Sequence, residues 1–283
     1  MQRQTISSYE LHYHPIQWWS KFNWQEFFWY KDFLFLLIWR NISIRYRQTV
    51  IGVAWVVIQP VVNLVVFTLV FNHMAGIKSS DGLPYPIFLM VGLLFWQYFS
   101  TATTFASSCL IDNPELINKV YVPRYMLPLA VPISVGVDFG VGVVLLLVML
   151  LCWGVGFSLL SFLILPVLFF EAMLMVYGVG LILSSINAQF RDIRFVVPFF
   201  LQILFYLTPI FYPIEILNNH PLLKQVLIIF NPLTGMVTLA RSCIAGEGID
   251  AGLLLITMSA SIVIFLLGWF FFRRREMILA DII

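Results

Sequence analysis

The sequence contains few charged residues. Of its 283 residues, 11% are charged and 61% are hydrophobic, whereas soluble domains carry roughly 25% charged residues. Together with a mean hydropathy of +0.93, this composition excludes an ordinary soluble domain and indicates an integral membrane protein. The formal net charge is only +2, so the overall charge points to no nucleic-acid partner.

Several signatures of enzyme and redox chemistry are missing. No Gly-Lys dipeptide occurs, so the chain lacks the G-x-x-x-x-G-K-[ST] loop that cradles ATP phosphates. There is no H-E-x-x-H or G-x-S-x-G, and the four histidines form no metal or nucleophile pattern. Cys109, Cys152 and Cys243 form no C-x-x-C pair, so each is expected to serve packing. We therefore expect no enzyme activity, no metal site and no ATPase in this chain.

Six apolar stretches are long enough to cross a bilayer, which needs about 20 residues. They are 50–71, 87–107, 129–153, 158–183, 195–212 and 251–272. The predicted fold is an all-α integral membrane protein whose six transmembrane helices occupy 50–272. Residues 213–250 contain two apolar runs broken at Asn231-Pro232. Each run is too short to span, which predicts re-entrant or interfacial helices between spans five and six.

The basic residues predict the orientation. Residues 1–32 are polar, aromatic and interrupted by Pro15, so they do not resemble a removable targeting segment and should stay in the cytoplasm. With six crossings, thirteen Lys and Arg fall on the cytoplasmic side, and Lys78, Lys224 and Arg241 fall outside. This asymmetry obeys the positive-inside rule. Both termini, including the tail 273–283, are therefore predicted to be cytoplasmic.

Residues 33–49 are predicted to form an amphipathic helix before the first span. One face carries an apolar stripe at helical spacing, made of Phe35, Ile38, Trp39, Ile42 and Tyr46. The opposite face carries Arg40, Ser43 and Arg47. We expect this helix to lie on the membrane surface, with its basic face toward headgroups or a cytoplasmic protein. A simple membrane anchor explains the pattern equally well.

Two charged loops lie on the predicted cytoplasmic side. In the first, Asn113-Pro114-Glu115 is typical of a helix start and Pro123 of a stop, which predicts a helix of about two turns. A short rigid helix between two spans can act as a lever. The second loop is 187–194. Solvated turns that obey the positive-inside rule are the alternative for both loops.

Two acidic residues, Asp138 and Glu171, fall inside predicted spans. A charge at the centre of a span costs about 2.5 to 3.5 kcal/mol, so each should face the interior and have a partner or be protonated. Structural hydrogen bonding and a role in ion coupling or the transport path both remain open. No Lys or Arg lies mid-span to pair with either residue.

A set of short motifs occurs in order along residues 33–245. The motifs are R-Y-R-Q-T-V-I-G-V-A-W at 45–55, Q-P at 59–60, P-Y-P at 84–86, G-L-L-F-W at 92–96, N-K-V-Y-V-P-R at 118–124, F-R-D-I at 190–193, T-P-I-F-Y-P at 208–213 and N-P at 231–232. This ordered set resembles the permease subunits of polysaccharide-exporting ABC transporters, which export O-antigen, teichoic acid and capsule. The resemblance is closest to the O-antigen branch.

The resemblance implies a passive transport subunit in the bacterial inner membrane. In that family two permease copies form the pathway, and two copies of a separate ATPase, which binds ATP and Mg, dock beneath them. This implies a multi-pass homodimer surrounded by membrane lipids, exporting a lipid-linked polysaccharide and binding no cofactor itself. No nucleic-acid partner is implied.

The resemblance also implies roles for particular residues. The ATPase-coupling residues would be Glu115, Leu116, Asn118, Lys119, Tyr121, Arg124, Arg191 and Asp192. The interface helix would contribute Arg40, Arg45 and Arg47. The first and fifth spans resemble pathway-lining helices, and their candidate residues are Trp55, Phe67, Phe71, Phe199, Phe200, Phe205 and Tyr206. Because aromatic faces suit sugar C–H groups, we expect about three of them to face the lumen.

Two other classes of function remain open at this stage. One is an ABC permease of the same architecture that moves a small lipid or a drug. The other is an ion-coupled secondary transporter or an intramembrane enzyme. Co-purification with a soluble ATPase separates ABC permeases from the second class. Loss of surface polysaccharide on deletion separates polysaccharide export from small-molecule export.

Overall fold

The computed structural model describes residues 28–46, 54–79, 82–119, 123–156, 159–190 and 192–282, which contain helices and no strand. The longer helices are α2 (Lys31–Tyr46), α3 (Ala54–Phe67), α4 (Tyr85–Ser108), α6 (Met126–Cys152), α7 (Leu159–Gln189), α8 (Ile193–Leu207) and α11 (Ala251–Ile282). The shorter ones are the π-helical η1 (Thr68–Met74), α5 (Pro114–Lys119), the 3-10 helix η2 (Ile214–Asn219), α9 (Pro221–Phe230) and α10 (Pro232–Ala245). The predicted all-α class is confirmed for the described residues.

Within the described residues, five helices are long and apolar enough to cross a membrane. They are α3 continued by η1, α4, α6, α7 and α11. They correspond to predicted spans one to four and six. The helices α9 and α10 bend by 101° at Asn231, and counting them as one broken span gives six. The predicted break at Asn231-Pro232 is therefore present.

The predicted fifth span, 195–212, differs most from the structure. Here α8 is a 15-residue helix that ends at Leu207. It is about 22 Å long at about 1.5 Å per residue, shorter than the roughly 30 Å of a bilayer core. Residues 208–212 are not helical although 209–212 continue the apolar run, because Pro209 interrupts the pattern and removes a backbone donor.

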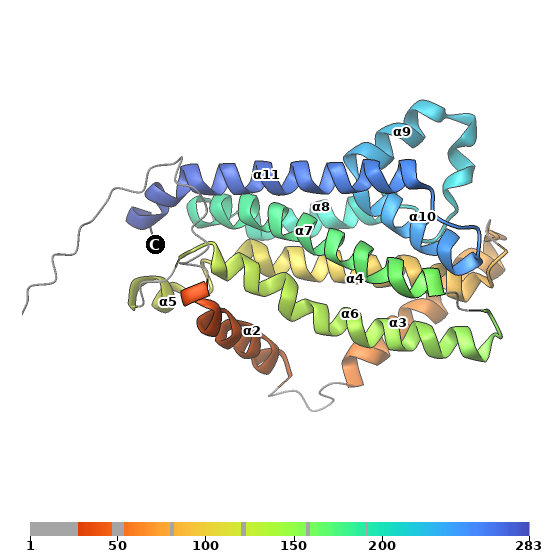
Figure 1. The fold of residues 1–283 in the computed structure, drawn as a ribbon, viewed down its shortest axis with the longest axis horizontal. Coiled ribbons are helices and arrows are strands. Elements are labelled where there is room, and N and C mark those ends of the chain that lie inside the picture. Colours follow the sequence, from red (N-terminus) through yellow and green to blue (C-terminus); the bar gives the residue numbers. More distant parts are fainter. Residues whose placement is uncertain are drawn as a thin grey trace, which may run out of the picture.

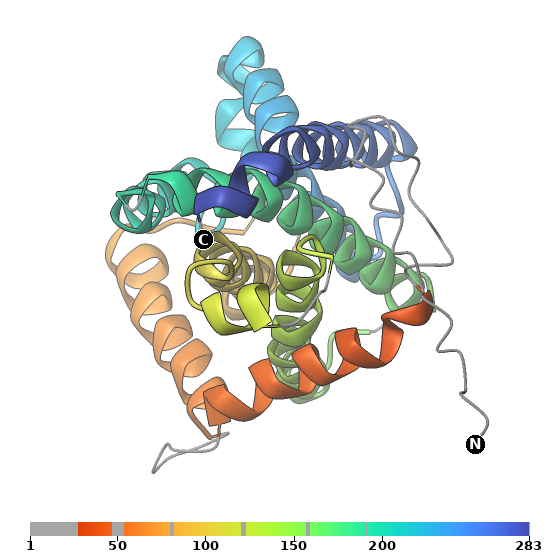
Figure 2. The same ribbon diagram turned by 90° about the vertical axis from the view of Figure 1, so that its left-hand side faces the viewer.

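The spanning helices lie side by side, and the short elements gather at the two ends (Figure 1). The end of α11 lies beside α5 at one end, whereas α9 and α10 lie at the other end. Viewed along the bundle, α2 lies along one side of it and α5 lies near the centre of the face (Figure 2). The chain enters and leaves the α9–α10 pair at the same end of the bundle.

The bundle has a tightly packed side and a loosely packed side. A Cβ on Gly268 of α11 would lie 2.2 Å from the carbonyl oxygen of Gly178 in α7, so only glycine permits this approach. Most of α4 is buried, whereas α3 has no buried residue. A helix with little packing is easier to displace than its neighbours.

The break after α8 is held by side chains from α4, from α10 and from the turn before α10. Arg241 of α10 donates to the carbonyl oxygens of Phe88 at 3.1 Å, Pro209 at 2.7 Å and Ile210 at 2.6 Å. Its guanidinium also lies 3.5 Å from the centre of the Phe88 ring. Although Arg241 was counted as an outer cation, it is buried within the protein, with 2% of its surface exposed.

Two further hydrogen bonds complete this arrangement, which we call the carbonyl clasp. The Tyr85 hydroxyl donates to the carbonyl oxygen of Phe211 at 2.8 Å, and the Asn231 amide donates to Thr208 Oγ1 at 2.7 Å. Gly92 of α4 leaves room for it, because a Cβ there would lie 2.7 Å from Arg241 Nη2. Irregular backbone at membrane depth requires such partners. The motifs at 84–86, 92–96, 208–213 and 231–232 therefore meet at one place.

Candidate functional site

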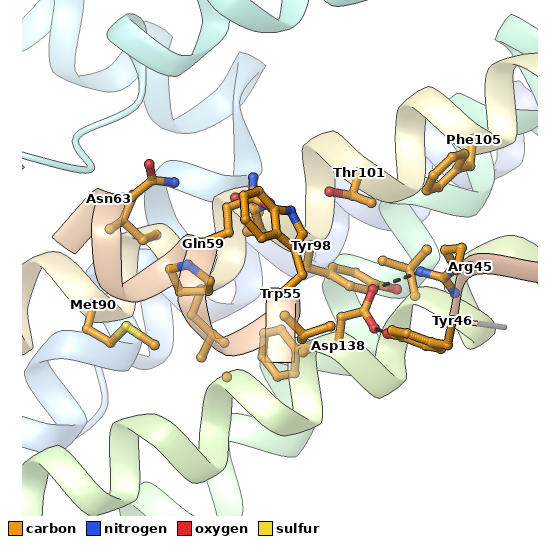
Figure 3. Close-up of a pocket in the computed structure, with 18 residues that line it drawn as sticks. Arg45, Tyr46, Trp55, Gln59, Asn63, Met90, Tyr98, Thr101, Phe105 and Asp138 are labelled. Atoms are coloured by element: carbon orange, nitrogen blue, oxygen red, sulfur yellow. Dashed lines mark hydrogen bonds and ion pairs between the residues drawn. The ribbon is translucent and has the colours of Figure 1, made fainter. Parts of the chain in front are cut away.

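A cavity of about 590 Å³ lies between the end of α2 and the helices α3, α4 and α6 (Figure 3). We call it the inter-span cavity, and its volume is within the roughly 300–1,000 Å³ typical of ligand sites. Its walls are largely apolar and include Trp55, Met90 and Phe139. Of the predicted pathway residues, Trp55 is the one that lines it.

Polar side chains that make no hydrogen bond to the described residues line this cavity from two helices. Gln59 and Asn63 follow Trp55 at intervals of four residues on α3, and Thr101 lies on α4 (Figure 3). Gln97 of α4 also lines the cavity. In the described part of the chain these four side chains make no hydrogen bond to protein. Because unpaired polar groups at membrane depth are costly, they require water or a ligand that forms hydrogen bonds. Sequence reasoning missed them, since four isolated polar residues in apolar spans form no motif.

An ion pair closes the α2 end of the cavity. Arg45 Nη1 lies 2.8 Å from Asp138 Oδ2, and the Tyr46 hydroxyl donates to Asp138 Oδ1. Burial, and then the hydrogen bond to Asp138, raises the pKa of Tyr46 to about 12, so the phenol is a neutral donor. The expectation that Asp138 has a partner is confirmed. That partner lies on α2 rather than in a span.

The other intramembrane acid, Glu171 of α7, is also buried. The Ser261 hydroxyl of α11 donates to Glu171 Oε1 at 3.4 Å. Its second oxygen, Oε2, has no hydrogen-bond partner among the described residues. The predicted interior orientation is confirmed, and the arrangement fits structural hydrogen bonding between α7 and α11.

The orientation of α2 differs from the prediction. The face that packs on the bundle carries Leu34 and Leu37, one residue before the predicted apolar stripe. Arg40 donates to the side-chain oxygen of Asn113, and Arg45 reaches Asp138. Arg40 therefore lies on the side of α2 that faces the bundle, and its predicted contact with headgroups or a cytoplasmic protein stays a prediction. Phe35 and Trp39 are exposed on the outer side, and Arg47 lies outside the described residues.

Four predicted pathway aromatics come together at the opposite end from α5. The ring of Phe67 lies 5.9 Å from Phe71 and 5.7 Å from Phe205, and Phe205 lies 5.4 Å from Tyr206. The Phe71 ring stacks on the Phe211 ring, with 4.3 Å between the ring centroids. Phe211 lies in the segment after α8 that the carbonyl clasp holds. The remaining two pathway candidates, Phe199 and Phe200, are 66% and 60% exposed on α8.

The short helix α5 confirms the predicted helix start at Pro114. Glu115 is exposed and Leu116 packs against the core. Asn118 and Lys119 end the helix and are described by their backbone alone. Arg124 donates to the carbonyl oxygen of Glu276 in α11 at 2.9 Å. Tyr121 and Arg191 lie outside the described residues.

The two charged loops touch each other. Arg194 Nη2 lies 2.9 Å from Asp112 Oδ1, and the Ser108 hydroxyl donates to Asp112 Oδ2 at 2.6 Å. The second loop is shorter than expected, because α7 continues to Gln189 and its Asn187 is buried, donating to the Ser107 carbonyl at 2.8 Å. Asp192 is exposed at the start of α8. These bonds connect α4, α7 and α8 directly beside α5.

The described residues contain no group of three or more His, Cys, Asp or Glu that could hold a metal ion. Cys109 and Cys243 are buried, as packing requires, whereas Cys152 is exposed at the end of α6. Burial raises the pKa of the Cys109 thiol, which makes it unreactive.

The chain matches the family of ABC-2 type transporters over residues 33–245. It is 27% identical over 215 residues to the O-antigen export system permease protein RfbA of Myxococcus xanthus, covering 76% of this chain and 80% of that protein. It is 25% identical over 252 residues to the RfbA permease of Klebsiella pneumoniae, covering 89% and 95%. The polysialic acid transport protein KpsM of Escherichia coli is 24% identical over 249 residues, covering 84% and 91%.

Proposed function

Because the chain belongs to the ABC-2 type transporter family, we propose that it is the permease subunit of an ABC system that exports a lipid-linked, O-antigen-like polysaccharide across the bacterial inner membrane. The family match from residue 33 to residue 245 carries this proposal, since it includes the inter-span cavity and the carbonyl clasp. The names of the relatives, which are O-antigen and polysialic acid transporters, support a polysaccharide cargo.

The energy for transport comes from a separate ATPase subunit, of which two copies bind ATP and Mg. The absence of a phosphate loop in the sequence supports this division of labour. The end of the bundle that carries α5 faces the cytoplasm, as the thirteen basic residues predict. Glu115 and Leu116 on α5, together with Asp192 at the start of α8, form the contact with the ATPase.

Two copies of the permease form the pathway. The exposed face of α8, with Phe199 and Phe200, and the weakly packed α3 are the surfaces offered to the second copy. Sugars pass over aromatic faces and past amide side chains such as Gln59 and Asn63, because both groups suit a chain rich in C–H and hydroxyl groups. The bent α9–α10 pair is re-entrant and covers the outer end of the pathway.

Movement of α5 is transmitted to the spans through the loop contacts. The Asp112–Arg194 pair links the loop before α5 to the start of α8, and the Arg124 bond links the loop after it to α11. Pro60 in α3 and Pro198 in α8 allow these two helices to bend. Pro209 lies in the segment after α8, and the carbonyl clasp holds this segment and so fixes the end of α8 at Leu207.

Deletion of the gene tests the cargo. We expect surface polysaccharide to disappear and the lipid-linked polymer to accumulate on the cytoplasmic side, with recovery on re-expression. Normal surface polysaccharide, with altered export of a small lipid or drug, would support the alternative ABC permease. Purification of the tagged chain from its native membrane tests the partner. The absence of a co-purifying ATPase, together with transport driven by an ion gradient, would contradict both ABC functions.

A further inference from the structure

A second cavity lies beneath α2, at the end of the bundle that carries α5. It has a volume of about 290 Å³ and is bounded by α2, the end of α4 and the start of α6. We call it the α2 cavity. Its polar lining includes Arg40 and Arg45 from α2, Asn113 just before α5 and Ser134 from α6.

Two guanidinium groups in this cavity have unused donors. Arg40 Nη2 donates to Asn113, and Arg45 Nη1 donates to Asp138. Arg40 Nε and Arg45 Nη2 are buried and have no hydrogen-bond partner among the described residues. Arginine presents its donors in a planar fork that matches the oxygen atoms of phosphate and carboxylate groups. Two arginine side chains that line one cavity from neighbouring turns of α2 favour an oxyanion there.

The charges around the cavity leave one positive charge in excess. Asp138 neutralises Arg45, and Arg194 neutralises Asp112, which also lines the cavity. Arg40 meets no carboxylate in the described ranges, and its hydrogen bond to Asn113 supplies no negative charge. Desolvation lowers the pKa of Arg40, as expected for a cation that has lost water without gaining a counter-ion. An anion at this position would restore the balance.

The apolar residues around the cavity favour a lipid as the source of that anion. The walls of the cavity are apolar where Leu37, Leu127 and Val131 line it, and free phosphate would leave them uncovered. On its outer side α2 exposes Phe35 and Trp39, which are typical of a helix at the membrane interface. Basic pockets at this depth bind the headgroups of anionic lipids.

We propose that the α2 cavity binds the phosphate of a resident anionic glycerophospholipid, held by Arg40 and Arg45, with its glycerol and upper acyl chain against Leu37 and Val131. This site goes beyond the proposed function, because it requires neither cargo nor ATPase. Its lipid stabilises the packing of α2 on α6, next to the Arg45–Asp138 pair.

Lipid retention by the purified full-length chain tests the site. Phosphatidylglycerol per chain, measured by mass spectrometry of extracted lipid, should fall roughly threefold or more in Arg40→Gln, since a lost charge-assisted contact weakens binding about tenfold. Arg274→Gln is the matched control, because it removes the same charge from an exposed position on α11. An unchanged level in Arg40→Gln, or an equal fall in both variants, would overturn the proposal.

The wild-type chain supplies a test that needs no variant. Phosphatidylglycerol should raise the thermal midpoint by about 5 °C, and neither phosphatidylcholine nor inorganic phosphate should match it. A photoreactive phosphatidylglycerol should label 34–46 and 127–134. An equal shift with inorganic phosphate would show a free-anion site, and labelling confined to the outer faces of α3 and α8 would show surface lipid. Either result would refute the proposal.

Discussion

At the scale of single residues, the Arg45–Asp138 pair connects α2 to the long helix α6. Asp138→Asn should lower the free energy of unfolding by about 1 to 3 kcal/mol, because Arg45 would lose its counter-charge while partly buried. Thermal unfolding in detergent measures the change. Asp32→Asn removes an exposed carboxylate from the first turn of α2 and is the control. Equal stability of the two variants would show that the pair contributes nothing.

Gly92 provides a second test at this scale. In Gly92→Ala the new Cβ would lie 2.7 Å from Arg241 Nη2 and 2.9 Å from the carbonyl oxygen of Ile210. Because one neighbour is backbone, the clasp must shift, and we expect a loss of about 1 to 3 kcal/mol from overpacking. Gly140→Ala in α6 is the control, since a Cβ there has no neighbour within 4 Å. A lower thermal midpoint for Gly92→Ala than for Gly140→Ala would show that strain at the clasp causes the loss. Equal midpoints would attribute any change to helix propensity.

At the scale of elements, Arg241 joins α10 to the break after α8. Arg241→Lys keeps the charge but loses the fork that reaches three carbonyl groups. We expect α10 to loosen and the free energy of unfolding to fall by at least about 2 kcal/mol.

The native cysteines report this loosening. Cys243 lies two residues after Arg241 and is buried, so Arg241→Lys should make it accessible to a maleimide reagent. Exposed Cys152 should react in both proteins, and buried Cys109 should react in neither. If Cys243 stays protected in the variant, Arg241 does not hold α10 in place.

The sequence predicts the position of most helices, but not always which face of a helix packs against the rest of the protein. Spans one to four and six follow from long apolar runs, because hydropathy depends on residue type alone. In α2, however, the stripe beginning at Leu34 and the stripe beginning at Phe35 are both apolar. Periodicity cannot choose between them, since the choice depends on packing against α6. The predicted stripe was therefore one residue out of register.

The candidate site was predicted less completely than the spans. Asp138 was recognised as costly, but its partner Arg45 lies 93 residues away, where no local pattern connects them. The sequence stays apolar at 209–212, after α8 has ended at Leu207. Hydropathy therefore placed the end of the fifth span five residues too late. The clasp depends on contacts among α4, α8 and α10, which only the folded chain brings together.

At the scale of the whole molecule, α5 is proposed to transmit the force of the ATPase. Glu115→Ala should reduce export roughly tenfold while ATP hydrolysis by the reconstituted complex continues, since the loss of one interfacial contact is worth about 1 to 2 kcal/mol. Glu247→Ala removes an exposed carboxylate at the opposite end and should export normally. Transport at the wild-type rate in Glu115→Ala would remove Glu115 from the coupling contact.

The proposed homodimer also has a direct test. In a background without native cysteines, Phe199→Cys on the exposed face of α8 should form a disulfide between copies upon oxidation in native membranes. Leu163→Cys on α7 is exposed to a similar extent, 60% against 66%, and should remain monomeric. Cross-linking through Leu163→Cys but not through Phe199→Cys would place the contact between copies on α7.

The carbonyl clasp has a consequence for the engineering of chimeric exporters. Its donors are Tyr85, Asn231 and Arg241, and its acceptors lie at 208–211 and at Phe88. The pair α9–α10 is consequently not a separable module. A graft of α9 and α10 from another transporter should succeed only when the recipient also receives the matching turn after α8 and the first two turns of α4.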